Sequence, residues 1–355
     1  MSIEWGLLIC SVIAWWVFRW AFRHLPNECW QIAVAIPARK RADGDNGSTW
    51  PAVNITFYGV ISAVAHLLAI LAFVFLAGAA KQPIAAVAIF SCLLLVVGIP
   101  ASKWVALWVE GVPGHTIGGA LFAVVLSITP ALFLTSVVCD WLSLPRAQSG
   151  VLLSAAAIAY VLGEAIGRLA CLSFGCCYGR TIDSATPLQR ALYSSTATTY
   201  RGRFKKIAYA SGLDGRPVIA VQSVACALLY AVFAVSVWLF WKGLFAAALI
   251  VALGLAQLWR AYSETLRADD RGREGFTLYQ GMALVGSGLT FVYASIYSVP
   301  ADIIAQPTFV QGLGAMLRIE VILSSQFLAI LILTLMGRSY VTSSRLEYQL
   351  HMPKT

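Results

Sequence analysis

Residues 163–180 read Gly-Glu-Ala-Ile-Gly-Arg-Leu-Ala-Cys-Leu-Ser-Phe-Gly-Cys-Cys-Tyr-Gly-Arg. The stretch begins inside an apolar run, where it carries Glu164 and Arg168, and it leaves through a turn rich in glycine and cysteine. Ionisable side chains at membrane depth are costly, so they mark candidate functional sites. The apolar run reaches the length of about 20 residues that a spanning helix needs. The stretch therefore indicates a membrane protein with a polar site at one end of a spanning helix.

The composition of the whole chain supports this interpretation. Of its 355 residues, 59% are hydrophobic and 12% are charged, whereas soluble domains carry about 25% charged residues. We expect an all-α polytopic membrane protein with about nine transmembrane helices. The predicted ranges are 3–22, 54–79, 83–108, 115–138, 148–173, 217–241, 243–262, 276–297 and 319–337.

Three segments are predicted along the chain. Residues 54–297 form a core of seven helices, residues 1–53 add an N-terminal helix and a polar loop, and residues 298–355 add a C-terminal helix and a tail. The longest loop, 174–216, is rich in Ser, Thr, Tyr and Arg. It is long enough to form a small head over one membrane face.

Charge restricts the partners. The net charge of +9 is spread over loops and not gathered in one tail, which argues against a nucleic-acid surface and favours anionic lipid. If the helices alternate in direction, most Lys and Arg residues outside them share one face. The opposite face holds Lys81, Arg146, Lys242 and Arg318. By the positive-inside rule, the charged face is predicted to be cytoplasmic.

Glu164 and Arg168 are one helical turn apart, so they share a helix face. One interpretation is an internal ion pair that fixes helix packing. The other is an arginine directed at an anionic lipid head group, because a guanidinium binds phosphate bidentately. A second charged segment, 263–272, follows the seventh predicted helix. Taken alone it is typical of a solvated loop; together with Arg168 it indicates a second cation over the same site.

Other features are weaker signals. Tyr58 lies in a predicted helix, where an aromatic residue is usually an interface anchor. Gln222 is typical of a hydrogen bond between helices, and Gly118-Gly119 is typical of close helix packing. His115 is a candidate base at the membrane surface.

The stretch 163–180 contains three cysteines, Cys171, Cys176 and Cys177. Three thiols without an obvious fourth ligand are weak evidence for zinc. A thiol nucleophile needs a nearby base, and no histidine is close in sequence. We interpret these cysteines as small packing residues, and we predict no metal site.

Residues 167–180 resemble the signature of the prolipoprotein diacylglyceryl transferase family, many of whose members read Gly-Arg-Ile-Gly-Cys-Phe, a short gap, and then Gly-Cys-Cys-Tyr-Gly. Weaker matches follow in the family's order within 54–297. They are Tyr58-Gly59, Gly118-Gly119, Pro217 to Gln222, Glu264 and Arg267 with Asp270-Arg271-Gly272, and Gln280. The chain departs from the family pattern at other positions. Ile117 and Arg216 replace two histidines, and Val221-Gln222 replaces Tyr-Glu.

The resemblance implies a multi-pass enzyme of the bacterial inner membrane. It would transfer a diacylglyceryl group from phosphatidylglycerol to the lipobox cysteine thiol of a prolipoprotein, releasing glycerol phosphate. Because the acceptor supplies the nucleophile, the reaction requires neither a metal nor an organic cofactor. Arg168 and Arg267 are expected to hold the phosphate and stabilise the leaving group. Glu264 would orient them, and the general base stays open between His115 and Glu164. The predicted substrate-binding residues are Tyr58, Gly118, Gly119, Gly175, Gly179 and Gln222.

Two alternatives remain. The family's site usually faces away from the cytoplasm, whereas the charge distribution predicts the opposite. A transferase of the same fold with a different acceptor, at the cytoplasmic face, would remove this conflict. A lipid-binding or transport protein without catalytic activity is the second alternative.

Overall fold

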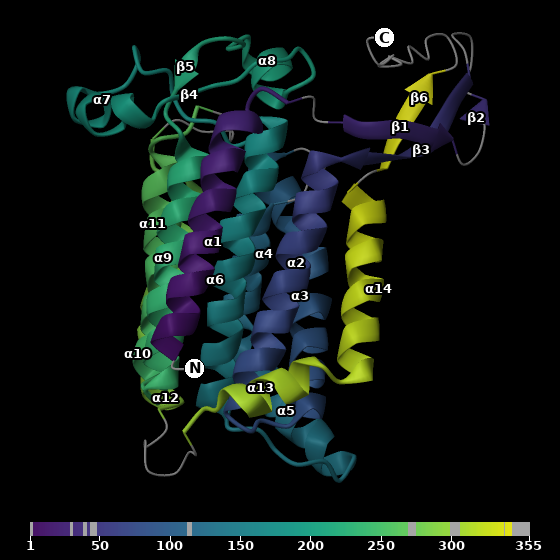
Figure 1. Ribbon diagram of the computed structural model, residues 1–355, viewed down its shortest axis with the longest axis vertical. Helices are drawn as coiled ribbons and strands as arrows, with labels where there is room; N and C mark the ends of the chain where they lie inside the picture. The colour runs from purple at the N-terminus through teal and green to yellow at the C-terminus, as the bar shows by residue number, and fades with distance from the viewer. Residues whose placement is uncertain are drawn as a thin grey trace.

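The computed structural model describes residues 3–28, 31–37, 41–42, 48–111, 116–268, 275–298, 306–336 and 338–342. Most of these residues are helical, and the long helices run side by side along the longest axis of the molecule (Figure 1). The continuous long helices are α1 (Ile3–His24), α2 (Phe57–Ala79), α3 (Ile84–Glu110), α6 (Ser149–Phe174), α9 (Val221–Trp241), α12 (Leu278–Ile296) and α14 (Ile319–Met336).

Two further spans are irregular. The segments α10 (Phe245–Leu249), η2 (Ile250–Gly254) and α11 (Leu255–Glu264) follow one another as a single span, in which η2 is a π-helical turn. A π-helical turn shifts the side chains that follow it around the helix axis. The helices α4 (Ile117–Leu126) and α5 (Ile128–Trp141) meet at Ser127 with a bend of 59°.

The chain is a multi-pass membrane protein. Among the described residues, seven helical segments are long and apolar enough to cross a membrane, or eight if α4 and α5 form one span. The seven are α1, α2, α3, α6, α9, the α10–α11 segment and α14. The predicted range 276–297 also forms a helix, α12, but this helix is not among them. Its Ser287 and Thr290 side chains donate hydrogen bonds to the backbone oxygens of Gly254 and Gly286.

Helix α6 lies at the centre of the bundle and packs most extensively against α2 and α9. A Cβ added at Gly163 would lie 3.0 Å from the Cβ of Ala69, so a small residue there allows α2 and α6 to approach closely. In the apolar windows of α6 and of the α10–α11 segment, 61% of the residues are buried, against 11% in α1 and 17% in α14. These two most buried spans carry Glu164, Arg168 and Glu264 of the predicted site.

A short helix, α13 (Phe309–Met316), crosses one end of the bundle before α14 begins (Figure 1). It touches α2 at two glycines. A Cβ at Gly78 would lie 2.3 Å from the Cβ of Ala315, and a Cβ at Gly312 would lie 2.7 Å from the backbone oxygen of Phe75. Both positions require glycine, because a larger residue would push the two helices apart.

Two small antiparallel sheets accompany the helices, although the sequence pattern predicts only helices. In one sheet β3 (Ser48–Thr56) pairs with the other three strands, which are β1 (Gln31–Pro37), β2 (Arg41–Ala42) and β6 (Arg338–Thr342). Where β3 pairs with β6, Trp50 lies opposite Val341. This pairing joins distant parts of the chain, so no local sequence pattern predicts it. The second sheet joins β4 (Thr198–Thr199) to β5 (Pro217–Val218).

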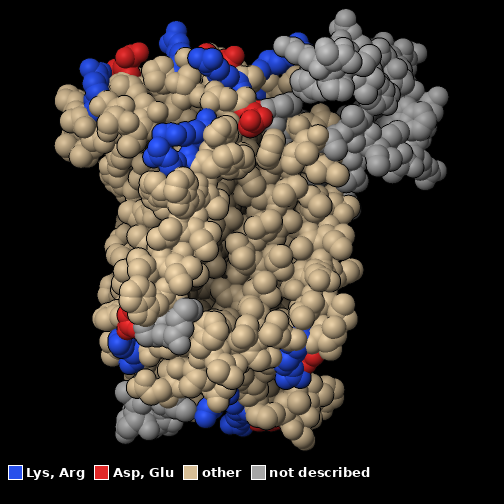
Figure 2. Space-filling view, viewed as in Figure 1, with Lys and Arg blue, Asp and Glu red and all other residues tan. Residues whose placement is uncertain are grey.

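The polar elements gather at the end of the bundle where α6 ends (Figure 1). The predicted head contains α7 (Pro187–Tyr193), α8 (Lys206–Ser211) and β4. Lys205 is buried there and donates hydrogen bonds to the backbone oxygens of Leu25 (3.0 Å) and Ser173 (2.6 Å). It thereby ties the head to the ends of α1 and α6. Figure 2 shows the charged side chains near the two ends, with a band of uncharged residues between them in this view.

Candidate functional site

Three ionisable side chains meet inside the bundle. Glu164 of α6 accepts hydrogen bonds at the same oxygen, Oε1, from Arg168 one turn later and from Arg260 of α11. The Nη2 atom of Arg260 lies 2.5 Å from Oε1. The side chains of Glu164, Arg168 and Arg260 are 8%, 13% and 10% exposed. The predicted pair in α6 is therefore part of an arginine cluster, the name used below for these three residues.

The arginine cluster contains two guanidiniums and one carboxylate, so it carries a surplus positive charge. Three of its buried atoms have no hydrogen-bond partner among the described residues, namely Oε2 of Glu164, Nε of Arg168 and Nε of Arg260. Buried charges are normally paired and hydrogen-bonded. The surplus charge and the unused N–H donors are suited to an anion.

Two neighbouring glycines of α4 have different roles: one lies beside the arginine cluster and the other allows close helix packing. A Cβ added at Gly118 would lie 3.3 Å from Nη1 of Arg260, so glycine leaves room for the guanidinium. A Cβ at Gly119 would lie 2.3 Å from Cγ1 of Val105 in α3. Gly118 therefore lies at the predicted site, whereas Gly119 allows two helices to pack closely.

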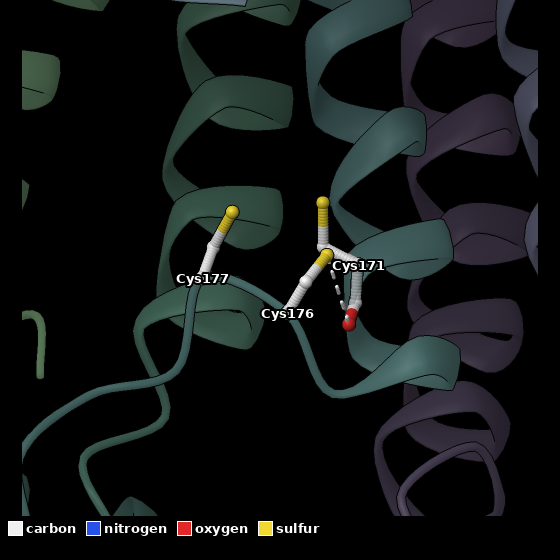
Figure 3. Close-up of side chains that lie close together, drawn as sticks. All are labelled: Cys171, Cys176 and Cys177. Carbon is white, nitrogen blue, oxygen red and sulfur yellow. Dashed lines mark hydrogen bonds between the residues drawn. The ribbon is translucent and has the colours of Figure 1, made fainter. Parts of the chain in front are cut away.

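The chain turns sharply after α6. Gly175 has a φ of +69° and Cys177 has a φ of +56°, and a left-handed backbone at a non-glycine residue is uncommon. The sulfur atoms of Cys171, Cys176 and Cys177 all lie within 4.8 Å of one another (Figure 3). We call these residues the cysteine triad. Hydrogen bonds with the other two thiols, together with burial, raise the pKa of the Cys176 thiol well above its usual value.

Two predicted residues contact this turn from neighbouring helices. Gln222 of α9 donates a hydrogen bond of 2.6 Å from Nε2 to the backbone oxygen of Cys176. The ring of Tyr58 in α2 packs edge-on against Phe174, with 5.8 Å between the ring centroids. The sequence-predicted residues Tyr58 and Gln222 thus support the turn that carries the cysteine triad.

Three segments that are far apart in the sequence meet beside this turn. The backbone N–H of Arg180 donates to the oxygen of Leu266 at 2.9 Å, and the N–H of Ala268 donates to the oxygen of Tyr178 at 3.1 Å. On the other side, the N–H of Ile219 donates to the oxygen of Arg180 at 2.9 Å. Three of the segments that carry the family resemblance, 167–180, 217–222 and 264–267 with its flanking residues, are therefore hydrogen-bonded to one another.

Replacing Gly179 with alanine should disrupt this junction. The new Cβ would lie 2.4 Å from the backbone oxygen of Ile219, and a backbone atom cannot rotate away. We expect the free energy of unfolding to fall by about 2 kcal/mol, measured as a lower thermal midpoint in detergent. Gly167→Ala is the control, because nothing lies within 4 Å of that position. Equal midpoints for Gly179→Ala and the wild type would contradict the prediction.

Arg267 and Glu264 form a second buried ion pair. Nη1 of Arg267 lies 3.3 Å from Oε1 of Glu264, and the side chains are 7% and 5% exposed. The backbone of Arg267 pairs with that of Gly179. The Nε atom of Arg180 donates a hydrogen bond of 3.4 Å to the carbonyl oxygen of Arg267. The predicted second cation thus lies beside the turn after α6, next to an acidic partner of its own.

The predicted base His115 and the motif residues Asp270-Arg271-Gly272 lie outside the described residues. Arg260, which forms an ion pair with Glu164, is not among the residues predicted from the sequence. The signal was present, because Arg260 is an ionisable residue inside the predicted span 243–262 and meets the criterion that identified Arg168.

No protein-family model matches the chain, and no curated protein matches it. The family resemblance is thus a hypothesis that depends on the motifs and on the contacts between them.

Proposed function

We propose that the chain is a transferase of the bacterial inner membrane that uses phosphatidylglycerol, or another anionic phospholipid, as its donor. In this proposal it transfers the diacylglyceryl group to the lipobox cysteine thiol of a prolipoprotein and releases glycerol phosphate. The observation that carries the proposal is the surplus positive charge of the buried arginine cluster.

The cluster has the chemistry of a phosphate site. Each guanidinium presents several N–H donors in a fixed plane that matches phosphate oxygens. Glu164 uses one oxygen to hold both arginines, which orients their remaining donors before a ligand arrives. We therefore assign Glu164 the role of an anchor for Arg168 and Arg260 and not that of the general base.

The proposed reaction displaces phosphate from a glyceryl carbon. The acceptor thiol gives its proton to water, its sulfur forms a bond to that carbon, and the carbon–oxygen bond breaks. The electron pair of the broken bond passes to the phosphate. The phosphate thus gains a second negative charge during the step. A fixed positive charge stabilises this developing charge more than it stabilises the bound lipid, so it favours the transition state.

The remaining residues would position these groups. The Glu264–Arg267 pair lies beside the turn after α6. There Arg267 would contact the lipid head group as a further cation. Gly175 and Gly179 allow the turn to adopt its shape. Tyr58 and Gln222 support the same turn.

One observation favours a second candidate function. The site lies at the end of the bundle that carries the head, which is the end predicted to be cytoplasmic. A transferase of the same fold with a cytoplasmic acceptor fits that orientation. Reporter fusions in the head, after Ala197, and in the α5–α6 turn, after Leu144, distinguish the two. A head outside the cytoplasm supports the lipobox acceptor, and a head in the cytoplasm rules it out.

Lipid binding tests the part of the proposal that both candidates share. We expect the purified protein to retain phosphatidylglycerol in preference to phosphatidylcholine in native mass spectrometry, because only the former carries a net negative charge. Replacing Arg260 with glutamine should abolish this preference, whereas Arg146→Gln at the opposite end should preserve it. Equal retention of the two lipids by the wild type would contradict an anionic site.

A further inference from the structure

The sequence predicts no metal site and a reaction without a metal, but the cysteine triad has the arrangement of a metal site. Among the described residues, it is the group of three side chains whose ligand atoms converge, within 4.8 Å of one another. Cys171 lies on the last turn of α6, and the other two lie on the turn that follows. Their sulfur atoms are on the same side of that turn (Figure 3). None of the three is in a disulfide.

The spacing is close to that of a thiolate-bound zinc ion. A zinc–sulfur distance of about 2.3 Å in tetrahedral geometry places the sulfur atoms about 3.8 Å apart. The observed spacing exceeds this by at most about 1 Å, which side-chain rotation can remove. Thiolates are among the preferred ligands of zinc.

The backbone holds the three thiols together. The carbonyl oxygen of Cys171 accepts hydrogen bonds from the N–H groups of Gly175 (2.9 Å) and Cys176 (3.2 Å), and Gln222 holds the carbonyl of Cys176. The left-handed backbone at Cys177 carries a cost that only the surrounding contacts can sustain. Such strain is typical of positions where a particular side-chain direction matters.

The charge of the neighbouring arginine cluster favours zinc binding at the cysteine triad. Three thiolates and one Zn²⁺ ion have a net negative charge. Arg168 lies three residues before Cys171 on the same face of α6, and the arginine cluster carries a surplus positive charge. The two sites would therefore compensate each other inside the membrane.

We propose that Cys171, Cys176 and Cys177 bind a zinc ion whose fourth position takes the acceptor thiol. The inference rests on the proposed function. Zinc sites with three protein ligands and one open position are the catalytic kind, and a thiol that coordinates zinc loses its proton. The metal would thus activate the acceptor, a task for which the sequence leaves the base open.

On coordination, the acceptor thiol gives its proton to water. The zinc-bound sulfur then forms a bond to the glyceryl carbon as the carbon–oxygen bond to phosphate breaks, and glycerol phosphate leaves with the electron pair. The thioether product is neutral, so it leaves the zinc ion more readily than the thiolate does.

Metal analysis of the purified full-length protein tests the site. We expect about one zinc ion per chain and an affinity at least about 100-fold lower in Cys171→Ser and Cys176→Ser. Cys226→Ser, which removes a buried thiol of α9 outside the triad, should keep its zinc. If both triad variants keep their zinc, the proposed site is wrong.

A measurement on the wild type covers the case in which a variant does not fold. Bound zinc should protect Cys171, Cys176 and Cys177 from alkylation by maleimide, with at least about tenfold slower modification than after chelation. The exposed Cys92 of α3 should react equally in both states. Equal alkylation of the triad with and without zinc would overturn the proposal.

Lipid transfer separates the two proposals. Full transfer by a metal-free protein in which all three cysteines are serine would overturn the role of zinc in activating the acceptor and leave the proposed function intact. Zinc bound at the triad without any lipid transfer would overturn the proposed function, together with the role assigned to the fourth position.

Discussion

Replacing Arg260 with glutamine is expected to lower lipid transfer by at least about 100-fold, the usual effect of removing one preorganised group that stabilises developing charge. Without Arg260 the cluster loses its surplus positive charge, because Arg168 and Glu164 then balance each other. Arg168→Gln should have a similar effect for the same reason. The measurement is the rate of diacylglyceryl transfer by protein that has inserted into the membrane and been purified in detergent.

Arg146→Gln is the matched control for this loss. Arg146 is also paired with an acidic residue, Asp140, but the pair is exposed and lies at the opposite end of the bundle. Transfer should be unchanged in this variant. Wild-type transfer in Arg260→Gln or in Arg168→Gln would show that the cluster only holds helices together.

Replacing Glu164 with glutamine is expected to cost about 3 kcal/mol of folding free energy. The carboxylate is the shared partner of two buried guanidiniums, and removing one member of a buried ion pair leaves an uncompensated charge. The measurement is the thermal midpoint of unfolding in detergent, where we expect a clear decrease.

A double variant identifies the cause of that decrease. Combining Glu164→Gln with Arg168→Gln removes one of the two stranded cations, so the combined loss should be smaller than the sum of the single losses. Asp140→Asn, which breaks the exposed pair with Arg146, should leave the midpoint unchanged. A Glu164→Gln protein with the wild-type midpoint would contradict the assignment of Glu164 as the anchor.

The length of apolar runs predicts most of the helices. The predicted range 148–173 corresponds to Ser149–Phe174, and 217–241 corresponds to Val221–Trp241. Hydropathy alone predicts neither the bend at Ser127 nor the π-helical turn at Ile250–Gly254. Pro130, three residues after the bend, is a local signal for it, because proline lacks the N–H that would continue the helix. Hydropathy also does not predict the pairing of β3 with β6, because these strands come from opposite ends of the chain.

The candidate site was predictable where it is local. Helical spacing places Glu164 and Arg168 together, and the structure contains that contact. Spacing cannot show that Arg260 reaches the same carboxylate, because it lies on another helix. The cysteine triad illustrates the same limit. Four residues lie between Cys171 and Cys176, and only the turn at Gly175 brings their sulfur atoms together.

Reconstituted transfer tests the central claim most directly. The purified protein is placed in vesicles of phosphatidylglycerol labelled in the diacylglyceryl group, together with a peptide that carries a lipobox cysteine, and the peptide is analysed by mass spectrometry. We predict that the wild type yields a peptide carrying labelled diacylglyceryl on the cysteine sulfur and releases glycerol phosphate, and that Arg260→Gln yields neither. Absence of both products with the wild type, while the Arg260-dependent preference for phosphatidylglycerol persists, would show that the protein binds the lipid without transferring it to this acceptor.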